Sequence, residues 1–588
     1  MLNIAVIQFR PAKGAYRENL ARLGEIFREA AALDPVPDLL ILPESALTGY
    51  FLEGGVAELA LSADELMADL AERHSVSRAP ALDVSIGFYE VWRNRLYNSA
   101  LYCTLGGPDA GIRHVHRKVF LPTYGVFDEE RFVEAGSNVT AFDTAWGRAA
   151  MMICEDAWHS IMPTLAALDG AQLLIVPSAT PARGLQPDDN PGVPASLERW
   201  ERLAQTISEE HGVYLTMAQL VGFEGGKAFA GGSIVTDPRG DIIARGPVFD
   251  EAIIPVTLDF DEITRARAET PLLADLEIKW PHLMASASIQ GDTVAPRSPR
   301  RAGTGVRAGR GVRDNGRDPL AIDPELTRHW LVEFLRDEIR RRRGFDKVVI
   351  GLSGGVDSSL VAFLAAEALG AEHVVGVRMP YRTSSDESLQ HAQMVADQLA
   401  IEVRTVDISG GVDSLDAAIG DDTTPTRLGN IMARMRMITL FDLSAALTAL
   451  PLGTGNKTER LFGYFTWHAD DSPPVNPIGD LFKSQVWQLA RHMGVPDAIV
   501  DKPASADLIH GQTDESDLGI SYPKADAILH RLLSGYRLDD VVELGFDASE
   551  VELVRDRLES THWKRRLPTV AMVSQTAIGE YYLRPVDY

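Results

Sequence analysis

The chain has 588 residues and a formal net charge of −26, with 57 Lys and Arg against 83 Asp and Glu. This length exceeds what one hydrophobic core supports and predicts about three or four domains. The negative charge argues against a general nucleic-acid or membrane-surface binder, because phosphate groups repel such a surface. Only two cysteines occur, Cys103 and Cys154, which excludes a disulfide framework and a cysteine-based zinc site.

The N-terminus enters an apolar stretch directly and has no charged segment followed by a long apolar core. No apolar run in the sequence approaches the roughly 20 residues that span a bilayer. The two cysteines suit a reducing compartment. We therefore expect a soluble, cytoplasmic protein with no membrane partner and no nucleic-acid partner.

Short apolar strands alternate with amphipathic helices across the first part of the chain. This alternation is typical of a layered α/β domain, and we predict one over residues 1–265. The expected strands are Asn3–Phe9, Asp38–Pro43, Val84–Glu90, Ser99–Leu105, Ala149–Cys154, Leu173–Pro177 and Tyr214–Val221, and the expected helices include Arg17–Leu33 and Ala195–His211.

An arginine-rich segment follows this domain. Ala295–Asp318 contains seven arginines among Gly, Pro and Ser, without apolar periodicity. Such a composition is typical of an exposed linker, although a basic run can also bind polyanions. We predict a connecting segment over 266–318 and a second α/β unit over 319–588. Its expected elements are the helices Pro324–Arg343, Ser388–Leu399, Asn430–Leu450 and Lys483–Met493 and the strand His373–Met379.

A glycine- and serine-rich loop stands between a strand and a helix in the second unit. Val348–Leu352 is an apolar run typical of a buried parallel strand, and Leu360–Ala366 continues as a helix. The loop between them contains Ser353, Gly354, Gly355, Asp357, Ser358 and Ser359. Glycines let the backbone approach a phosphate, and the helix N-terminus attracts its charge. Asp357 can hold the magnesium ion that accompanies pyrophosphate. The loop resembles the pyrophosphate loop of ATP-dependent adenylating enzymes.

Three segments of the first half carry a second kind of chemistry. Cys154 follows an apolar strand, where a nucleophile at a strand-to-helix elbow is held clear of the core. Glu44 ends a predicted strand, and Lys118 precedes a loop that contains a proline. A carboxylate can take the thiol proton, and an ammonium group favours the thiolate and later the oxyanion.

These segments, in this order, resemble the nitrilase superfamily, whose Glu-Lys-Cys triad cleaves C–N bonds through a thioester. The resemblance covers residues 1–260 and implies an α-β-β-α sandwich with Glu44, Lys118 and Cys154 as the triad. The run Leu121–Arg131 resembles that of glutamine-hydrolysing members. It implies that Glu129 is a second catalytic carboxylate; the alternative is a solvated loop acid. The resemblance further places Tyr124, Ser178 and Thr180 at the glutamine pocket, whereas Cys103 is expected to be structural.

Further segments of the second half resemble the NAD synthetase family over residues 325–588. They are Gly429–Arg436, Leu452–Glu459, Phe462–Thr466 with the following acids, Asn476–Lys483 and Gly511–Glu515. The resemblance implies a doubly wound parallel sheet and an enzyme that uses ATP to adenylate nicotinic acid adenine dinucleotide (deamido-NAD), after which ammonia displaces AMP. The fused, glutamine-dependent members of this family combine both halves.

The resemblance also implies roles for individual residues. The ATP site would contain the residues of the phosphate loop with Arg436 and Thr454. The deamido-NAD site would contain Asn430, Glu459, Asp470 and Lys483. Asp357 and Glu459 would hold Mg²⁺, and the protein would be a homo-oligomer, a dimer or larger. Trp467, Ala469 and Pro473-Pro474 depart from the common pattern beside the nicotinate position.

Two other functions fit part of this pattern. One is a different glutamine-dependent adenylating amidotransferase with another carboxylate as acceptor. The other is a protein without catalytic activity that senses glutamine or a nucleotide.

Overall fold

A computed structural model describes residues 1–52, 55–186, 192–293, 318–420, 423–505, 513–566 and 571. Two compact units contain most of them: 1–184 with 193–293 in the first, and 318–566 in the second. The arginine-rich segment lies outside the described residues except for Asp318. The domain boundaries at 265 and 318 therefore stay predictions. No helix of the described ranges is long and apolar enough to cross a bilayer.

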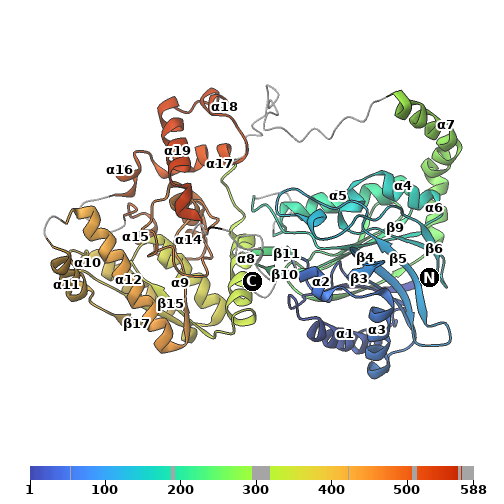
Figure 1. Ribbon diagram of the computed structural model, residues 1–588, viewed down its shortest axis with the longest axis horizontal. Coiled ribbons are helices and arrows are strands. Elements are labelled where there is room, and N and C mark those ends of the chain that lie inside the picture. Colours follow the sequence, from blue (N-terminus) through green and yellow to red (C-terminus); the bar gives the residue numbers. More distant parts are fainter. Residues whose placement is uncertain are drawn as a thin grey trace. The chain divides into compact units, whose positions relative to one another are not determined.

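The first unit has four layers. Two six-stranded sheets, in the orders β14-β1-β2-β3-β4-β5 and β13-β12-β9-β8-β7-β6, face each other. Figure 1 shows α1 and α3 outside one sheet and α4 and α5 outside the other. The strands are Leu2–Gln8 (β1), Leu39–Ile41 (β2), Leu82–Trp92 (β3), Arg95–Leu105 (β4), Gly111–Arg117 (β5), Ala141–Asp143 (β6), Arg148–Met151 (β7), Leu173–Ser178 (β8), Tyr214–Gln219 (β9), Val221–Glu224 (β10), Lys227–Ala230 (β11), Ile234–Thr236 (β12), Ile242–Arg245 (β13) and Ala252–Leu258 (β14).

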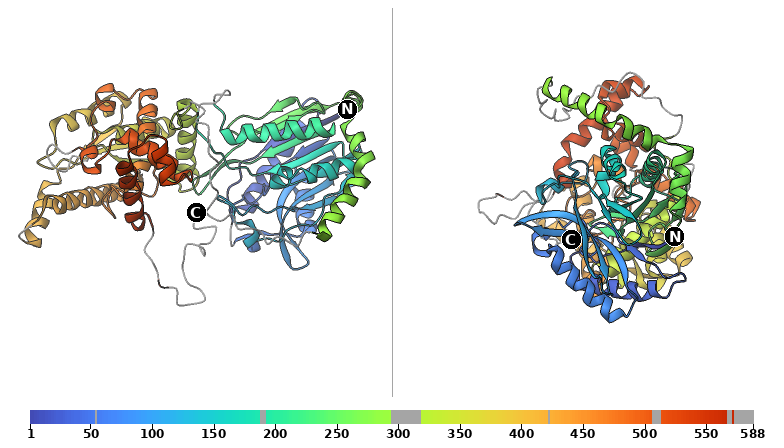
Figure 2. Two further views of the ribbon diagram at one scale, coloured as in Figure 1. Left: turned by 90° about the horizontal axis from the view of Figure 1, so that it is seen from above. Right: turned by 90° about the vertical axis from the view of Figure 1, so that its right-hand side faces the viewer.

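Helices cover both outer faces of these sheets. In the left view of Figure 2, α7 is the green helix at the edge of this unit, and α4 and α5 are the elements it contacts. The helices are Tyr16–Ala31 (α1), Val56–Leu59 (α2), Ala63–Ser77 (α3), Ile161–Leu168 (α4), Ala195–His211 (α5), Asp261–Glu269 (α6) and Leu272–Thr293 (α7), with 3₁₀ turns at Glu129–Arg131 and Cys154–Trp158.

Strand β1 shows why the sandwich forms. Its side chains alternate between the two faces of the sheet, as the period of a strand requires. Ile4 and Val6 pack between the two sheets, whereas Ala5 and Ile7 pack beneath α1 and α3. Because both faces of the strand are covered, its sequence is apolar almost throughout.

The second unit contains a parallel four-stranded sheet in the order β17-β16-β15-β18. Val348 and Ile350 of β15 pack with α8, α9 and α14, whereas Val349 faces α12. Helices therefore cover both faces. The strands are Lys347–Gly351 (β15), Val374–Arg378 (β16), Glu402–Thr405 (β17) and Ala449–Pro451 (β18).

A group of helices from the C-terminal part of the chain packs around its own core, which includes Phe462, Tyr522 and Val554. The helices of the second unit are Pro324–Arg336 (α8), Val356–Leu369 (α9), Asp386–Leu399 (α10), Ser409–Ile419 (α11), Pro425–Leu447 (α12), Lys457–Phe462 (α13), Lys483–His492 (α14), Asp497–Val500 (α15), Asp514–Leu518 (α16), Tyr522–Leu533 (α17), Leu538–Glu543 (α18) and Ala548–Ser560 (α19).

The predicted fold class is confirmed in both halves, as an α-β-β-α sandwich and a doubly wound parallel sheet. Several elements were predicted wrongly at their ends. The strand expected over Ala149–Cys154 ends at Met151, and the helix expected over Pro324–Arg343 ends at Arg336 and is followed by a π-helical turn over Asp337–Arg341. The expected helix Asn430–Leu450 ends at Leu447, because Thr448 takes a left-handed conformation at φ +50° and β18 begins at Ala449. The helices after α14 and the strands β5, β6, β10–β14, β17 and β18 were not expected from the sequence.

Candidate active sites

The ends of three elements bring the first group of functional residues together. Glu44 follows β2, Lys118 follows β5 and Cys154 begins the 3₁₀ turn after β7. Cys154 has φ +44°, an uncommon conformation for a residue with a side chain. Such an outlier marks a position that the surrounding structure constrains.

Lys118 is the centre of a buried ion cluster. Its Nζ atom lies 2.7 Å from Glu44 Oε1 and 2.8 Å from Glu129 Oε2. Glu44 is fully buried and Lys118 is 1% exposed. Glu129 is 7% exposed and is therefore not a solvated loop acid. One ammonium group thus contacts two carboxylates at a buried position, where solvent screens the attraction between their charges only weakly.

Asn98 connects the two carboxylates, and sequence reasoning missed it. Its Nδ2 group donates to Glu44 Oε1 at 2.7 Å and to Glu129 Oε1 at 2.5 Å. Asn98 lies in β4, fully buried. Its only signal was an amide side chain within a strand that is largely apolar. Glu44 Oε2 has no hydrogen-bond partner among the described residues, so this oxygen is available to accept a proton.

Burial dominates the electrostatics of this cluster. Burial raises the pKa of Glu44, and Lys118 acts against that rise. Burial works to lower the pKa of Lys118, but Glu129 and Glu44 outweigh it and hold that pKa well above its usual value. Burial and the charge of Glu44 raise the pKa of the Cys154 thiol, although Lys118 and the Ala179 backbone act in the opposite direction. The raised pKa favours the neutral thiol, which needs a base before it can attack.

A cavity of about 240 Å³ opens beside Glu129. Its walls are largely aromatic and apolar, with few charges. The lining residues are Tyr50, Phe51, Val56, Tyr89, Val126, Phe127, Asp128, Glu129, Arg131, Phe132 and Val133. Tyr50 and Phe51, which reach this cavity from the loop after Glu44, carry no motif by which sequence reasoning could have selected them.

The three predicted glutamine-pocket residues lie in different surroundings. Thr180 Oγ1 is 4.0 Å from Cys154 Sγ, and Ser178 is fully buried at the end of β8. Tyr124 is 59% exposed and donates to Glu155 Oε2 at 2.8 Å. Thr180 is therefore beside the thiol, whereas Tyr124 lies at the surface in this conformation.

The phosphate loop of the second unit follows β15. Gly354 has φ +78°, and an added Cβ would stand 2.2 Å from the Ser388 carbonyl oxygen, so glycine is required there. Ser353 Oγ accepts from the Gly355 N–H at 3.2 Å and lies 3.1 Å from Ser358 Oγ. Ser359 Oγ donates to the Gly355 carbonyl at 2.8 Å. The serine hydroxyls thus fix the loop at the N-terminus of α9.

A buried lysine joins this loop to the segment after β18. Lys483 Nζ donates to Asp357 Oδ2 and, at 3.4 Å, to Glu459 Oε1. Asn456, which the sequence did not single out, donates to Asp357 Oδ1 at 2.9 Å and caps α13 by accepting from the Glu459 N–H. The strand order of this sheet runs from β15 to β16 and β17 on one side and to β18 on the other, so it reverses between β15 and β18. The cluster lies at this topological switch point, where sheets of this kind bind ligands.

The charges of this cluster depend on one another. Burial raises the pKa of Glu459 to about 8, although Lys483 lowers it. Burial works to lower the pKa of Lys483, but Asp357 and Glu459 outweigh it and raise that pKa. The ammonium group is therefore retained and holds the two acids together.

The remaining predicted residues lie along α12 and in the loops beyond it. Arg436 Nε donates to the Met379 carbonyl at 3.3 Å, at the end of β16. Asn430 Oδ1 accepts from Thr466 Oγ1 at 3.1 Å, and Asp470 accepts from the Thr466 N–H at 3.0 Å. Thr454 lies in the loop between β18 and α13. Gly511 and Gln512 lie outside the described residues.

Two family models match the chain. The carbon-nitrogen hydrolase family matches residues 3–268, and the NAD synthase family matches residues 328–568. Among solved structures, the chain is similar to the glutamine-dependent NAD+ synthetase of Acinetobacter baumannii in complex with ADP. That match has a TM-score of 0.71 and 23% identity, and it covers 100% of this chain and 98% of the other. At this identity it shows a common fold.

Curated relatives extend the similarity to the sequence. The NH(3)-dependent NAD(+) synthetase of Chlorobaculum parvum is 45% identical over 261 residues, which are 44% of this chain and 94% of that protein. The glutamine-dependent NAD(+) synthetase of Thermotoga maritima is 31% identical over 601 aligned positions, which cover 100% of this chain and 98% of that protein. A full-length match of this kind includes both halves in the same order. The chain therefore belongs to the glutamine-dependent NAD(+) synthetase family.

Proposed function

We propose that this enzyme converts deamido-NAD to NAD+ with ATP, using ammonia that it releases from glutamine. The observation that carries the proposal is the presence of two built sites on one chain. One is the buried cluster of Glu44, Lys118 and Cys154, and the other is the cluster of Asp357, Glu459 and Lys483 at the switch point of the second sheet.

The first site suits hydrolysis of an amide. Glu44 takes the proton of the Cys154 thiol, and the sulfur attacks the amide carbon of glutamine. Lys118 stabilises the oxyanion that forms, and the protonated Glu44 returns its proton to the departing ammonia. Water then attacks the thioester with Glu44 again as the base, the C–S bond breaks, and glutamate leaves while Glu44 returns the proton to the Cys154 thiolate. The raised pKa of the thiol is compatible with this order, because the Glu44 carboxylate interacts with the thiol and can act as its base.

Glu129 is proposed to act together with Glu44. Its carboxylate neutralises part of the Lys118 charge and shares the Asn98 amide with Glu44. It also lines the cavity beside the site, where the α-amino group of glutamine would meet a negative charge. Ser178 and Thr180 are proposed to contact glutamine on the side of Cys154, where Thr180 Oγ1 lies 4.0 Å from the thiol sulfur, and Tyr124 is proposed to lie at the entrance to the glutamine site.

The second site suits adenylation of a carboxylate. Backbone N–H groups and hydroxyls of Ser353–Ser359 would bind the phosphates of ATP. The nicotinate carboxylate attacks the α-phosphorus and pyrophosphate leaves. Unprotonated ammonia then attacks the acyl carbon, AMP leaves, and the amide remains. The Lys483 ammonium group would leave Asp357 and Glu459 and contact the reacting phosphate. Arg436 and Thr454 would contact the nucleotide.

The acids of the second site fit a magnesium ion. Asp357 and Glu459 converge on one cation, Lys483 Nζ, and carboxylate oxygens are ligands that Mg²⁺ prefers. Within the described ranges, no three His, Cys, Asp or Glu side chains gather to hold a metal by themselves. The nucleotide phosphates would then supply further ligands. When bound, the ion neutralises charge on the departing pyrophosphate.

The acceptor is proposed to bind across the loops around Thr466. Asn430 and Asp470 both contact this residue, so they share one small region. The departures at Trp467 and Ala469 lie in the same loop, and Trp467 packs edge-on against Trp563 with ring centroids 5.2 Å apart. This aromatic pair would border the acceptor.

The protein is further proposed to be a cytoplasmic homo-oligomer, a dimer or larger. Cys103 and Cys154 are both free thiols, which suits a reducing compartment. On α12, Ile438 is 54% and Phe441 39% exposed, and a second copy would cover them. Light scattering at working concentration tests this, and a monomeric mass would contradict it.

One assay separates the proposed function from its alternatives. The protein is supplied with ATP, deamido-NAD and either glutamine or ammonium, and NAD+ and AMP are measured. Formation of NAD+ with both nitrogen sources is expected. AMP formation only with another carboxylate would indicate a different amidotransferase, and no turnover with any acceptor would indicate a sensing protein.

A further inference from the structure

A buried aspartate lies two residues after Cys154 and accepts four hydrogen bonds. Asp156 Oδ1 accepts from the backbone N–H groups of Val119 and Phe120, both at 2.9 Å. Asp156 Oδ2 accepts from the Ile153 N–H at 3.0 Å and lies 2.9 Å from His116 Nε2. The side chain is fully buried.

These partners come from both catalytic segments of the first site. Val119 directly follows Lys118, and Ile153 directly precedes Cys154. The Asp156 carboxylate therefore connects the backbone next to Lys118 to the backbone next to Cys154. An ionised carboxylate offers about four acceptor positions, and all of them are used here.

A second buried aspartate makes comparable contacts in the second unit, between the two segments that carry its reactive residues. Asp526 in α17 is fully buried, and its Oδ1 accepts from Thr458 Oγ1 at 2.5 Å while Oδ2 accepts from the Ser484 N–H at 2.8 Å. Thr458 precedes Glu459, and Ser484 follows Lys483. Thr458 Oγ1 also accepts from the Lys483 N–H at 3.1 Å. The Asp526 carboxylate therefore connects the segment that contains Glu459 to the segment that contains Lys483.

We propose that Asp156 and Asp526 are positioning residues, each of which holds the two reactive segments of its own half in register. This inference rests on the proposed function of the two sites. Neither aspartate touches the reacting atoms in the proposed mechanism. Asp156 acts through backbone N–H groups next to Lys118 and Cys154, and Asp526 acts through the Thr458 hydroxyl and the Ser484 N–H. Loss of either aspartate therefore displaces the thiol from its base or the lysine from its acid.

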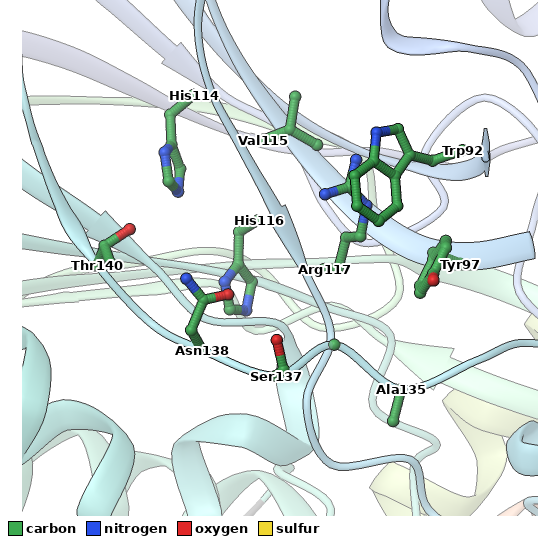
Figure 3. Close-up of a pocket in the computed structure, with 11 residues that line it drawn as sticks. Trp92, Tyr97, His114, Val115, His116, Arg117, Ala135, Ser137, Asn138 and Thr140 are labelled. Carbon is green, nitrogen blue, oxygen red and sulfur yellow. The ribbon is translucent and has the colours of Figure 1, made fainter. Parts of the chain in front are cut away.

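His116 is the one side-chain partner of Asp156 named above, at 2.9 Å from Oδ2. Figure 3 shows it in a cavity of about 160 Å³ together with Ser137 and Asn138. This cavity shares no lining residue with the cavity beside Glu129. A substitution of His116 therefore changes the support of Asp156 without changing the walls of the proposed glutamine pocket.

The main test compares Asp156→Asn with Asp526→Asn in the full chain. An amide oxygen accepts fewer hydrogen bonds than a carboxylate, and its NH₂ group opposes the N–H donors. A displacement of about 1 Å at a reactive group costs roughly a hundredfold in rate. Asp156→Asn should lower glutamate release about that much and leave ammonium-driven NAD+ synthesis within about threefold. Asp526→Asn should do the reverse, lowering synthesis from both nitrogen sources while glutamate release persists.

Two matched pairs separate positioning from loss of folding. His116→Gln keeps a side-chain N–H near Asp156, whereas His116→Leu has none. Thr458→Ser keeps the hydroxyl, whereas Thr458→Val has the shape of threonine without it. His116→Gln should retain most of the glutamate release that His116→Leu loses. Thr458→Ser should likewise retain most of the NAD+ synthesis that Thr458→Val loses. For the His116 variants, the KM for glutamine should change less than about threefold while kcat falls, because the pocket walls are untouched.

The proposal would be overturned if each aspartate variant affected both half-reactions equally. It would also be overturned if His116→Leu were as active as His116→Gln and Thr458→Val as active as Thr458→Ser. An inactive wild-type protein would instead refute the proposed function. The rate of Cys154 alkylation by iodoacetamide gives a readout independent of turnover. It should change at least threefold in Asp156→Asn and remain unchanged in Asp526→Asn, and an unchanged rate in both variants would count against the proposal.

Discussion

Gly87 of β3 lies directly against Glu44, so that a Cβ atom at Gly87 would stand 2.5 Å from the Glu44 Cα atom. Backbone hydrogen bonds fix this approach, since the Gly87 N–H donates to the Pro43 carbonyl and the Ala46 N–H donates to the Gly87 carbonyl. The position of the proposed general base therefore depends on the absence of a side chain on the neighbouring strand.

We expect Gly87→Ala to lower glutamine-driven synthesis by roughly a hundredfold, because the added Cβ forces the backbone at Glu44 to shift. Ammonium-driven synthesis should remain, since the second half is unchanged. Gly24→Ala is the matched control: in helix α1, its Cβ would meet nothing closer than 3.8 Å. Equal activity of the two variants with glutamine would contradict the prediction.

Cys154→Ala should abolish glutamate release and glutamine-driven synthesis while leaving ammonium-driven synthesis largely intact. The thiol belongs to the first cluster, and free ammonia can enter the second site directly. Cys103→Ala is the control, because Cys103 lies in β4 away from these groups. Equal loss with both nitrogen sources would show that the two half-reactions are not divided between the two halves.

Asp357→Asn and Glu459→Gln should each abolish synthesis from either nitrogen source, while glutamate release persists at some level. Loss of one magnesium ligand removes charge stabilisation from the departing pyrophosphate, and a loss of at least a hundredfold is expected. Asp480→Asn serves as the control, since its side chain is 96% exposed. Near-normal turnover of either site variant at ordinary magnesium would reject the assignment.

Local patterns predicted much of this structure. The alternation of apolar strands and amphipathic helices predicted an α/β domain in each half. Glu44 and Cys154 were placed at strand ends and Lys118 before a loop that contains a proline, and the structure brings Lys118 to Glu44. Strand periodicity and turn residues act over a few neighbours, so a single sequence displays them.

Contacts between distant segments could not be predicted in the same way. Asn98 joins acids that are 54 and 31 residues away, and β14 pairs with β1 across most of the first half. Neither leaves a periodic signal in the sequence. The end of α12 was missed for a local reason, since Thr448 breaks the helix without a glycine or proline.

The pH dependence of Cys154 alkylation tests the electrostatics of the first site. Burial and Glu44 raise the thiol pKa above the usual value of about 8.5. Below a raised pKa the thiol is mostly neutral, and its thiolate fraction grows about tenfold for each pH unit. The rate of reaction with iodoacetamide in the free protein should therefore keep rising from pH 7 through pH 9.5 without levelling.

Lys118→Met should slow this alkylation at every pH, because the ammonium group lowers the thiol pKa and its removal raises that pKa further. The modified peptide is quantified by mass spectrometry, with Cys154→Ala as the blank for the buried Cys103, whose own pKa burial raises to about 12. A plateau between pH 7 and 9 would mean that the free protein already holds a thiolate. In that case Lys118 would outweigh burial, and Glu44 would not be needed to take the first proton.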